Sequence, residues 1–288
     1  MMVSVCIITY DHEKYIAETL DGIAKQKTSF PMEVIIGEDC SKDGTRAICE
    51  HYANKYPDLI KLLPSDKNIG MLQNFDRTFK ACTGKYIAFT EGDDYWTDDS
   101  KLQKQVDFLE ANPAYSACFH NVIIKSERKD NKKEWIMHDK LLKDSFDTED
   151  LLGPWFIATT SFVFVNYPDF QLPDWFYKNK FLGDLPLMLL LSLRGNFKYM
   201  DEVMAVYRLH DTGMTTKYTG YDKIIAMVYL YESFNIYTNY RFNEKAKHAM
   251  IYEIDRHMPK PAANDAQKSE ETKTLHKKFL KKVRTIFK

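Results

Sequence analysis

Four short apolar runs alternate with helical patterns over the first 90 residues, and this alternation restricts the possible folds more than any other feature. Residues 3–9 (VSVCIIT) and 33–37 (EVIIG) lack the polar alternation of a half-exposed strand, so they are typical of strands buried on both faces. Residues 59–63 and 85–90 (KYIAFT) indicate two further strands. The resulting order, β-α-β-α-β-α-β, predicts a parallel sheet wrapped by helices.

Helical patterns fill the stretches between these strands. The spacing of Ile16 and Leu20 predicts the first helix, and residues 71–82 predict the third. Ser41 or Asp43 suits the N-cap of the second helix, because a short polar side chain there accepts a hydrogen bond from the first turn. Both side chains remain candidates for that cap.

Acidic residues gather where three of the predicted strands end. The segments are residues 9–13 (TYDHE), 38–41 (EDCS) and 91–94 (EGDD). Ligands of open α/β sheets bind in the crevice beyond the carboxyl ends of the strands. We therefore expect the three segments to converge on a single crevice.

Asp93 and Asp94 are adjacent carboxylates at the end of a buried strand, which is costly unless a positive charge lies between them. Hard oxygen ligands suit Mg²⁺ or Mn²⁺, so the pair predicts a divalent cation bound together with a diphosphate. The alternative is a helix cap. Asp98 and Asp99 fit that role better, because they directly precede the helix predicted over residues 101–111.

The rest of the chain is less regular. We expect strands at residues 116–124, 157–165 and 197–207, helices at residues 101–111, 185–193 and 221–240, and a charged, exposed segment at residues 125–144. Leu and Met occur on nearly every side of the helix at 185–193, which predicts that it is well buried.

Composition and motifs exclude several classes of protein. The 40 basic and 41 acidic residues leave a net charge of −1, which gives no footprint for nucleic acid. Five cysteines without C-x-x-C spacing are typical of reduced core residues in a cytosolic protein. No secretory signal is found, and no apolar run approaches the roughly 20 residues that cross a bilayer, so we expect a cytoplasmic protein. Phosphate-binding glycine loops are absent too, so a nucleotide would be held by side chains and metal.

Taken in order, the motifs resemble those of glycosyltransferase family 2. They are VSVCIITYDHEKYIAETLDGI, EVIIGEDCSKDGT, NIGMLQNFDRTFKACTGKYIAFTEGDDYW, KLQKQVDFLEANP and FLGDLPLMLLLSLRGNFKYMDEVMAVYRLH, and they extend over residues 2–215. The resemblance implies an α/β protein with the GT-A fold, in which helices flank a Rossmann-like, mostly parallel sheet. It also implies a catalytic domain over residues 1–217, followed by a helical region over residues 218–288.

The same resemblance implies a metal-dependent, inverting hexosyltransferase. Such an enzyme moves a sugar from a nucleotide-diphosphate donor, expected to be a UDP-sugar, to a saccharide or lipid-linked acceptor in bacterial surface-polysaccharide synthesis. Residues matching the family's site are the catalytic base Asp184, the nucleoside and donor contacts Thr9, Tyr10, Glu13, Asp39 and Asp93, the diphosphate segment Tyr207, Arg208 and His210, and the Mn²⁺ or Mg²⁺ ligands Asp94 and His210. Asp184 also suits the N-cap of an apolar helix with Pro186 in its first turn, and one residue can serve both roles.

Some positions depart from the family pattern. Many members carry Asp-Asp-Gly-Ser where this chain has residues 38–41, and Ala-Arg-Asn where it has residues 74–76 (NFD). Arg77 or Lys80 is a candidate substitute for the phosphate contact that is missing there. Trp96 is expected either to form a wall of the sugar site or to pack in the core.

Two other functions fit parts of the sequence. A nucleotidyltransferase on a similar sheet is disfavoured, because the chain lacks a glycine-rich first loop. A non-catalytic nucleotide-sugar-binding module is disfavoured, because a metal ligand and a base are both present. Release of UDP from the donor without acceptor distinguishes an enzyme from such a module.

Basic residues dominate the C-terminal segment. Residues 273–288 contain seven Lys or Arg and no acid, and their apolar side chains recur at helical spacing. This pattern is typical of a helix that lies in a membrane interface, so we expect contact with anionic lipid and a peripheral position at the inner face of the cytoplasmic membrane. The alternative is a helix packed on the catalytic domain with a solvated charged face.

Overall fold

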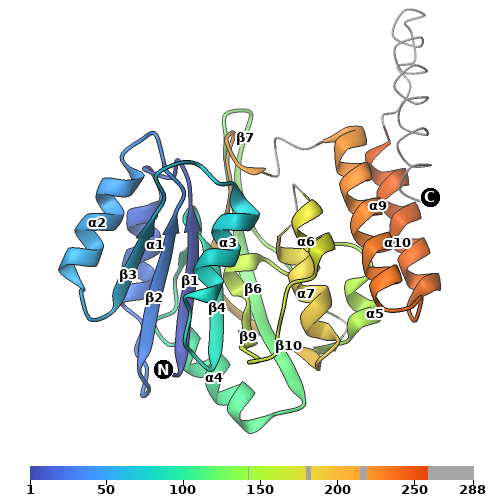
Figure 1. The fold of residues 1–288 in the computed structure, drawn as a ribbon, viewed down its shortest axis with the longest axis horizontal. Helices are drawn as coiled ribbons and strands as arrows, with labels where there is room; N and C mark the ends of the chain where they lie inside the picture. The colour runs from blue at the N-terminus through green and yellow to red at the C-terminus, as the bar shows by residue number, and fades with distance from the viewer. Residues whose placement is uncertain (142, 180–182, 215–218, 259–288) are drawn as a thin grey trace, which may run out of the picture. The chain divides into compact units, whose positions relative to one another are not determined.

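The structure is a computed structural model and describes residues 1–141, 143–179, 183–214 and 219–258 (Figure 1). The chain divides into two compact units. Unit 1 comprises Met1–Thr148, Phe156–Leu172 and Leu190–Asp211, and unit 2 comprises Glu149–Trp155, Pro173–Leu189 and Thr212–Lys288. The predicted domain boundary at residue 217 falls outside the described residues and stays a prediction.

All the strands that the structure describes belong to one sheet in unit 1. They are β1 (Val3–Thr9), β2 (Met32–Glu38), β3 (Ile60–Pro64), β4 (Tyr86–Glu91), β5 (Tyr95–Trp96), β6 (Tyr115–Arg128), β7 (Asn131–Ile136), β8 (Ser145–Phe146), β9 (Val163–Val165) and β10 (Asn196–Leu209). The sheet order is β3-β2-β1-β4-β9-β6-β10-β5, with β7 paired to β6 and β8 to β10.

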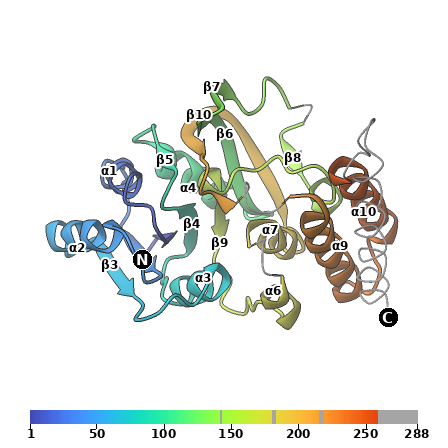
Figure 2. The same cartoon turned by 90° about the horizontal axis from the view of Figure 1, so that it is seen from above.

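Helices connect and flank these strands. They are α1 (Ile16–Ala24), α2 (Thr45–Lys55), α3 (Met71–Lys80), α4 (Lys101–Ala111), α5 (Thr148–Leu151), η1 (Thr159–Ser161), α6 (Asp174–Lys178), α7 (Asp184–Ser192), α9 (Gly220–Tyr237) and α10 (Asn243–His257). In unit 1, α1 and α2 lie on one face of the first four strands and α3 lies on the other (Figure 2). None of the helices within the described ranges is long and apolar enough to cross a membrane.

The predicted alternation of strands and helices is confirmed. β1 pairs in parallel with both β2 and β4, and β3 pairs in parallel with β2. Every residue of β1 is buried, as its continuous apolar run predicted. Burying a side chain such as Ile7 contributes about 1.5–3 kcal/mol, so this strand anchors the core of unit 1.

The second half of the sheet is mixed. β6 and β10 run parallel over almost their whole lengths, whereas β9 pairs antiparallel with both β4 and β6. The predicted strand at residues 157–165 is wrong in its first half, which forms the 3₁₀ helix η1. There the Thr160 hydroxyl bonds to Oγ1 of Thr90 at 2.9 Å, and its carbonyl accepts Nε1 of Trp96 at 3.0 Å, so these groups are satisfied outside a strand ladder.

Other differences are local. The charged segment at residues 125–144 is exposed as predicted over β7, but it also contains a hairpin in which β7 pairs with β6. α2 begins at Thr45, and Asp43 accepts hydrogen bonds from the Thr45 N–H at 3.0 Å and from its hydroxyl at 2.5 Å. The N-cap of α2 is Gly44 and makes no side-chain cap bond, so the prediction of Ser41 or Asp43 as the cap is wrong, although Asp43 bonds to Thr45 of the first turn.

Unit 2 contains a helical hairpin of α9 and α10. Phe234 and Phe242 stack near its turn with ring centroids 6.0 Å apart, and Tyr231 is completely buried and donates its hydroxyl to the Gly153 carbonyl at 3.2 Å. The predicted aromatic helix at residues 221–240 corresponds to α9. The basic segment at residues 273–288 lies outside the described residues.

Candidate active site

The segments that follow β2 and β4 meet at the end of β1. The Asp39 N–H donates to the Thr9 carbonyl at 3.1 Å, and the Gly92 N–H donates to the Ile8 carbonyl at 3.0 Å. β1 lies between β2 and β4 in the sheet, so its last residues support both segments. The expected convergence of these strand ends is therefore present.

An acidic cluster, defined here as Glu91, Asp93 and Asp94, follows β4. Carboxylate oxygens of the three residues lie within 4.8 Å of one another. Asp94 is almost fully buried, and its Oδ1 accepts the Arg208 N–H at 2.8 Å. Asp94 Oδ2 and Asp93 Oδ1 are buried without a hydrogen-bond partner among the described residues. Sequence reasoning singled out the two aspartates and missed Glu91, although it lies in the same EGDD run.

The pKa values of the two aspartates in the acidic cluster are shifted in opposite directions. Burial, followed by repulsion from Asp93 and Glu91, raises the pKa of Asp94 well above its usual value. Burial also acts to raise the pKa of Asp93, but the charges of His12 and His210 and a hydrogen bond from His210 outweigh it and lower that pKa. A divalent cation would relieve the repulsion and satisfy the partnerless oxygens, so the residues present fit such an ion.

Close packing fixes the backbone beneath the cluster. A Cβ at Gly92 would lie 2.5 Å from Oγ1 of Thr9 and 3.0 Å from Nδ1 of His12, so only glycine fits. The Thr19 hydroxyl lies within hydrogen-bond distance of two carbonyls of this turn, 3.1 Å from that of Gly92 and 2.6 Å from that of Asp94. Thr19 of α1 therefore fixes the backbone of this turn.

Two histidines face Asp93. Nε2 of His210 lies 2.9 Å from Asp93 Oδ2, and Nε2 of His12 lies 3.7 Å from the same atom. The sequence pointed to His210 and missed His12. The sequence signal that could have found His12 is its place three residues after the end of β1. There its Nδ1 lies 3.3 Å from Oγ1 of Thr9.

Arg208 is buried beside the cluster. Its guanidinium donates to the Asp93 carbonyl at 2.6 Å and forms an ion pair with Glu18. It also lies over the rings of Tyr15 and Tyr95, at 5.1 Å and 4.3 Å from their centroids. In this structure the side chain is therefore bound by protein groups of unit 1.

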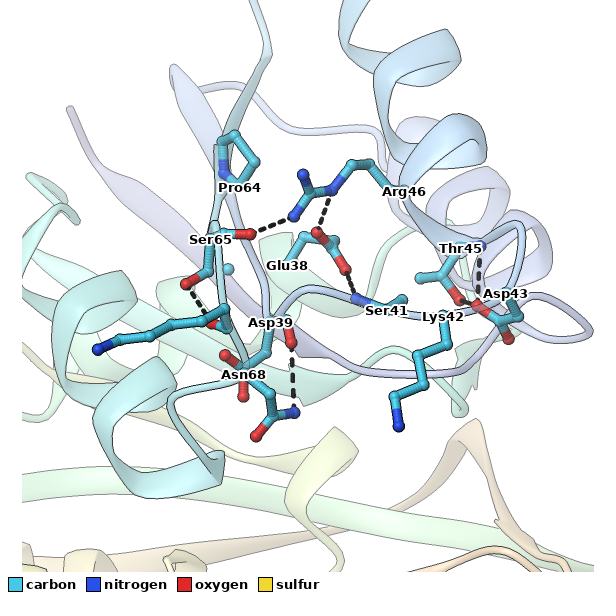
Figure 3. Close-up of polar contacts among 12 residues, drawn as sticks. Glu38, Asp39, Ser41, Lys42, Asp43, Thr45, Arg46, Pro64, Ser65 and Asn68 are labelled. Atoms are coloured by element: carbon cyan, nitrogen blue, oxygen red, sulfur yellow. Dashed lines mark hydrogen bonds and ion pairs between the residues drawn. The ribbon is translucent and has the colours of Figure 1, made fainter.

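Asp39 lies on the other side of the β1 end. It is almost fully buried, and its Oδ1 and Oδ2 accept the backbone N–H groups of Ile69 at 2.8 Å and Gly70 at 2.9 Å. Asn68 donates to the Asp39 carbonyl at 3.3 Å (Figure 3). Burial raises the pKa of Asp39 despite the two hydrogen bonds and the nearby charge of Arg77. The sequence analysis named Arg77 only as a candidate phosphate contact, and no sequence pattern indicated that its charge lies near Asp39.

The remaining nucleoside candidates lie in the loop after β1. Thr9 is buried, Tyr10 is half-buried and Glu13 is exposed. Burial, followed by the charge of Asp11, raises the pKa of Tyr10. The Glu13 N–H donates to Oδ2 of Asp43 at 3.1 Å, which ties this loop to the start of α2.

The structure resolves several alternatives left by the sequence. Arg77 donates to the carbonyls of Glu38 and Pro64, and Lys80 pairs with Asp76 at 2.7 Å, so both candidate phosphate contacts bond to protein. A guanidinium has five N–H donors and an ammonium group three, so these bonds do not exclude a phosphate contact, which stays a prediction.

Trp96 and Asp98 belong to the core and to a helix start, respectively. Trp96 is buried, and Nζ of Lys101 lies 4.1 Å from its ring centroid, so packing in the core is correct and a sugar-facing wall is wrong. The N-cap of α4 is Ser100 rather than the predicted Asp98 or Asp99, and Asp98 accepts the Ser100 N–H at 2.7 Å just before the helix.

The predicted base and the last diphosphate candidate come from separate elements. Asp184 is the first residue of α7 and is half-buried in unit 2. Tyr207 is half-buried in β10 of unit 1.

The model of Glycosyl transferase family 2 matches residues 4–175, which is more than half of the chain. The chain belongs to glycosyltransferase family 2. Its match to the family covers the acidic cluster and Asp39, whereas Asp184 and residues 207–210 lie beyond it.

Known relatives agree with this membership. The chain is 38% identical over 211 residues to an uncharacterized protein of Mycobacterium tuberculosis; the match covers 73% of this chain and 60% of that relative. The structure of residues 1–349 of TarS from Staphylococcus aureus in complex with UDP-GlcNAc aligns with a TM-score of 0.64 at 18% identity, covering 90% of this chain and 74% of that fragment. TarS is a poly(ribitol-phosphate) β-N-acetylglucosaminyltransferase.

A third match is a mannosyltransferase of Pyrobaculum calidifontis in complex with GDP-Man and Mn²⁺. It has a TM-score of 0.54 at 16% identity and covers 98% of this chain and 82% of that enzyme. At these identities the two solved structures show the fold, so the family 2 chain has the GT-A glycosyltransferase fold.

Proposed function

We propose that this family 2 glycosyltransferase transfers a hexose from a UDP-sugar to a hydroxyl of a saccharide or lipid-linked acceptor, with inversion at the anomeric carbon. The observation that carries the proposal is the pair of buried, partnerless carboxylate oxygens on Asp93 and Asp94, located beside the same strand end that supports Asp39. A metal–diphosphate site next to a nucleobase site is what a nucleotide-sugar donor requires.

The proposed donor site has two parts. Asp39 accepts the N3–H of uracil, and Thr9, Tyr10 and Glu13 form the loop around the nucleoside. Asp93 contacts the ribose or the donor sugar. The short distances that link the ends of β1, β2 and β4 support this division of roles.

Asp94 and His210 are the proposed ligands of Mn²⁺ or Mg²⁺. When bound, the cation neutralises the negative charge that develops on the leaving diphosphate. Tyr207 and Arg208 are assigned to the diphosphate as well. The guanidinium of Arg208 bonds to the Asp93 carbonyl, so its charge lies beside the acidic cluster, which supports this assignment.

Asp184 is the proposed general base. In a single displacement, the acceptor oxygen forms a bond to the anomeric carbon as the bond from that carbon to the diphosphate oxygen breaks. The hydroxyl proton passes to the Asp184 carboxylate, and attack on the face opposite the leaving group inverts the carbon. A positioned carboxylate contributes roughly 10²–10⁴-fold to such a step.

The relatives support the proposed acceptor and cellular setting. The name of TarS describes transfer of N-acetylglucosamine to poly(ribitol phosphate), and this supports the proposed role in bacterial surface-polysaccharide synthesis. We assign the chain to the cytoplasm, and we propose that residues 273–288 dock it on anionic lipid near a lipid-linked acceptor.

A donor screen tests the proposal. We expect UDP-sugars with Mn²⁺ to raise the melting temperature more than GDP- or dTDP-sugars do, and UDP to be released slowly from the preferred donor without acceptor. The solved neighbour with GDP-Man makes GDP the sharpest competitor. Stronger stabilisation by GDP contradicts the uracil assignment of Asp39, and absence of any donor hydrolysis contradicts the enzymatic function.

A further inference from the structure

Two arginines from different helices each join Glu38 to the C-terminal end of β3, one at its last residue, Pro64, and one at the next residue, Ser65. Arg46 of α2 bonds through Nε to Oε2 of Glu38 at 2.6 Å and donates from its terminal nitrogen to the Ser65 carbonyl (Figure 3). Arg77 of α3 donates to the Glu38 carbonyl at 2.8 Å and to the Pro64 carbonyl at 3.1 Å. We call Arg46 and Arg77 the arginine clamp.

Both arginines of the clamp bond to Glu38. Its side chain is completely buried, and its second carboxylate oxygen, Oε1, accepts the Ser41 N–H at 2.6 Å. Burial acts to raise the pKa of Glu38, but the hydrogen bonds from Ser41 and Arg46 outweigh it and lower that pKa. A buried carboxylate of this kind is costly to leave unpaired, so the bridge to Arg46 is held firmly.

The clamp lies directly before the proposed nucleobase site on both chain segments. Asp39 is the next residue after Glu38, and its carboxylate accepts the N–H groups of Ile69 and Gly70. Gly70 has a φ of 89°, a left-handed conformation that glycine adopts without strain. Glu38 and Pro64 are partners in the β2–β3 ladder, so the clamp reinforces this pairing at the point where the two polar loops begin.

Guanidinium chemistry explains why arginine occupies both positions. A planar guanidinium donates to two acceptors at fixed angles, whereas a lysine ammonium is a compact point charge on a flexible stem. Each clamp residue uses this geometry to bond to Glu38 of β2 and to a carbonyl of residues 64–65 at once. Lysine at either position would keep the charge and lose the bridge.

We infer that Arg46 and Arg77 are positioning residues for the nucleobase of the donor: without touching it, they hold Asp39 and the 69–70 backbone in the arrangement that receives the base. This inference rests on the proposed use of a nucleotide-sugar donor. Loops held in their binding arrangement lose less conformational entropy when the ligand binds, so the clamp contributes to affinity for the base and not to affinity for the diphosphate.

The test compares UDP with inorganic pyrophosphate, which lacks the base and the ribose, by calorimetry on the full-length chain with Mn²⁺. The variants are Arg46→Lys and Arg77→Lys, with Glu38→Gln as a second way to break the bridge to Arg46. Arg194→Lys is the matched control, because Arg194 pairs with the exposed carboxylate of Asp169 at 2.8 Å.

We expect each clamp variant to weaken UDP binding about tenfold, as loss of a hydrogen bond to a charged group does, and to leave pyrophosphate binding unchanged. Unchanged UDP affinity, or equal losses for UDP and pyrophosphate, overturns the inference while the proposed function stands. A wild-type chain that binds pyrophosphate but no nucleoside diphosphate overturns the proposed donor and the inference together. The control variant is expected to match the wild type with both ligands.

Discussion

The backbone N–H of Arg208 donates a 2.8 Å hydrogen bond to Oδ1 of Asp94, and Oδ2 of the same carboxylate is buried without a partner in the described part of the chain. Antiparallel pairing of β5 with β10 brings the two residues together, because Tyr95 lies opposite Val206. One oxygen is thus bound by protein, and the other is the atom that we propose as a metal ligand. This division makes Asp94 the most informative residue to change.

Replacing Asp94 by Asn tests the metal site. Asparagine keeps a carbonyl oxygen that accepts the Arg208 N–H and removes the negative charge. We expect Mn²⁺-dependent donor binding to be lost and the stability of the metal-free protein to rise, because repulsion within the acidic cluster falls. Calorimetric titration with Mn²⁺ and UDP, together with urea unfolding of the metal-free protein, measures both effects.

Asp76→Asn is the control for this experiment. Asp76 is paired with Lys80 on α3 and lies outside the acidic cluster. It should bind Mn²⁺ and UDP as the wild type does. Full metal-dependent turnover in Asp94→Asn would show that Asp94 is not a required ligand.

Replacing Asp184 by Asn tests the proposed base. The change is nearly isosteric and keeps a polar side chain at the start of α7. We expect kcat to fall by roughly 10²–10⁴-fold with little change in donor affinity, because proton transfer is needed only in the transition state. Steady-state kinetics with donor and acceptor measure the change. Asp174→Asn, at the exposed start of α6, is the control, and a near-normal kcat in Asp184→Asn would assign the proton to another acid.

Lys101 predicts an unusual dependence of stability on pH. Its side chain is completely buried, where Nζ donates to Oε1 of Gln105 at 2.7 Å, and burial lowers its pKa to about 7. Between pH 7 and pH 10 the unfolded lysine keeps its proton while the folded one loses it. The free energy of unfolding should therefore rise with pH by about 1.4 kcal/mol per pH unit relative to Lys101→Met.

Urea unfolding at several pH values from 7 to 10 measures this difference. Lys61 is exposed on β3, so Lys61→Met should follow the wild-type profile. Parallel profiles for wild type and Lys101→Met would mean that Lys101 keeps an ordinary pKa in the folded protein.

Cys40 occupies a backbone conformation that favours glycine. Its φ is 58°, in the left-handed region that costs a residue with a side chain roughly 1–2 kcal/mol. We expect Cys40→Gly to be about 1 kcal/mol more stable than Cys40→Ala, once the greater freedom of glycine in the unfolded chain is subtracted. Chemical denaturation of the two variants gives the comparison, and equal stabilities would argue against strain at this residue.

Removal of the basic segment tests the membrane proposal. A chain truncated after Asn264 should hydrolyse donor normally and fail to sediment with phosphatidylglycerol vesicles at low salt, because seven basic residues within 273–288 are lost. The full-length chain should be released from the vesicles at high salt. Equal sedimentation of the two proteins would exclude lipid docking by this segment.

Local patterns in the sequence predict the first half of the fold well. The runs at residues 3–9 and 33–37 become strands buried in the core, because their unbroken apolar character suits only a sheet covered on both sides. The acidic residues after the strands converge, because parallel strands end at one edge. The residues that sequence reasoning missed owe their roles to distant partners: Glu18 meets Arg208 across 190 positions, and no local spacing indicates such a pair.

Lys101 shows a different limit. Its position at the start of α4 looks like an ordinary exposed lysine, yet the buried face of the helix includes Lys101, Leu102 and Gln105. The i, i+4 spacing of Lys101 and Gln105 was visible, but the Trp96 ring that covers the lysine comes from the preceding strand. Tertiary packing therefore buries the side chain of Lys101, which the helix pattern alone does not predict.

The last residues of β1 have a consequence for how such enzymes diversify. The loops after β2 and β4 each bond to this strand end, but separate arginines secure them, the clamp on one side and Arg208 on the other. Either loop can therefore be replaced without changing the other loop or the end of β1. Grafting residues 38–46 and 64–77 from a relative that uses another nucleotide should switch the base preference, because the graft includes the positions of both clamp arginines. The proposed cation site after β4 should keep its function.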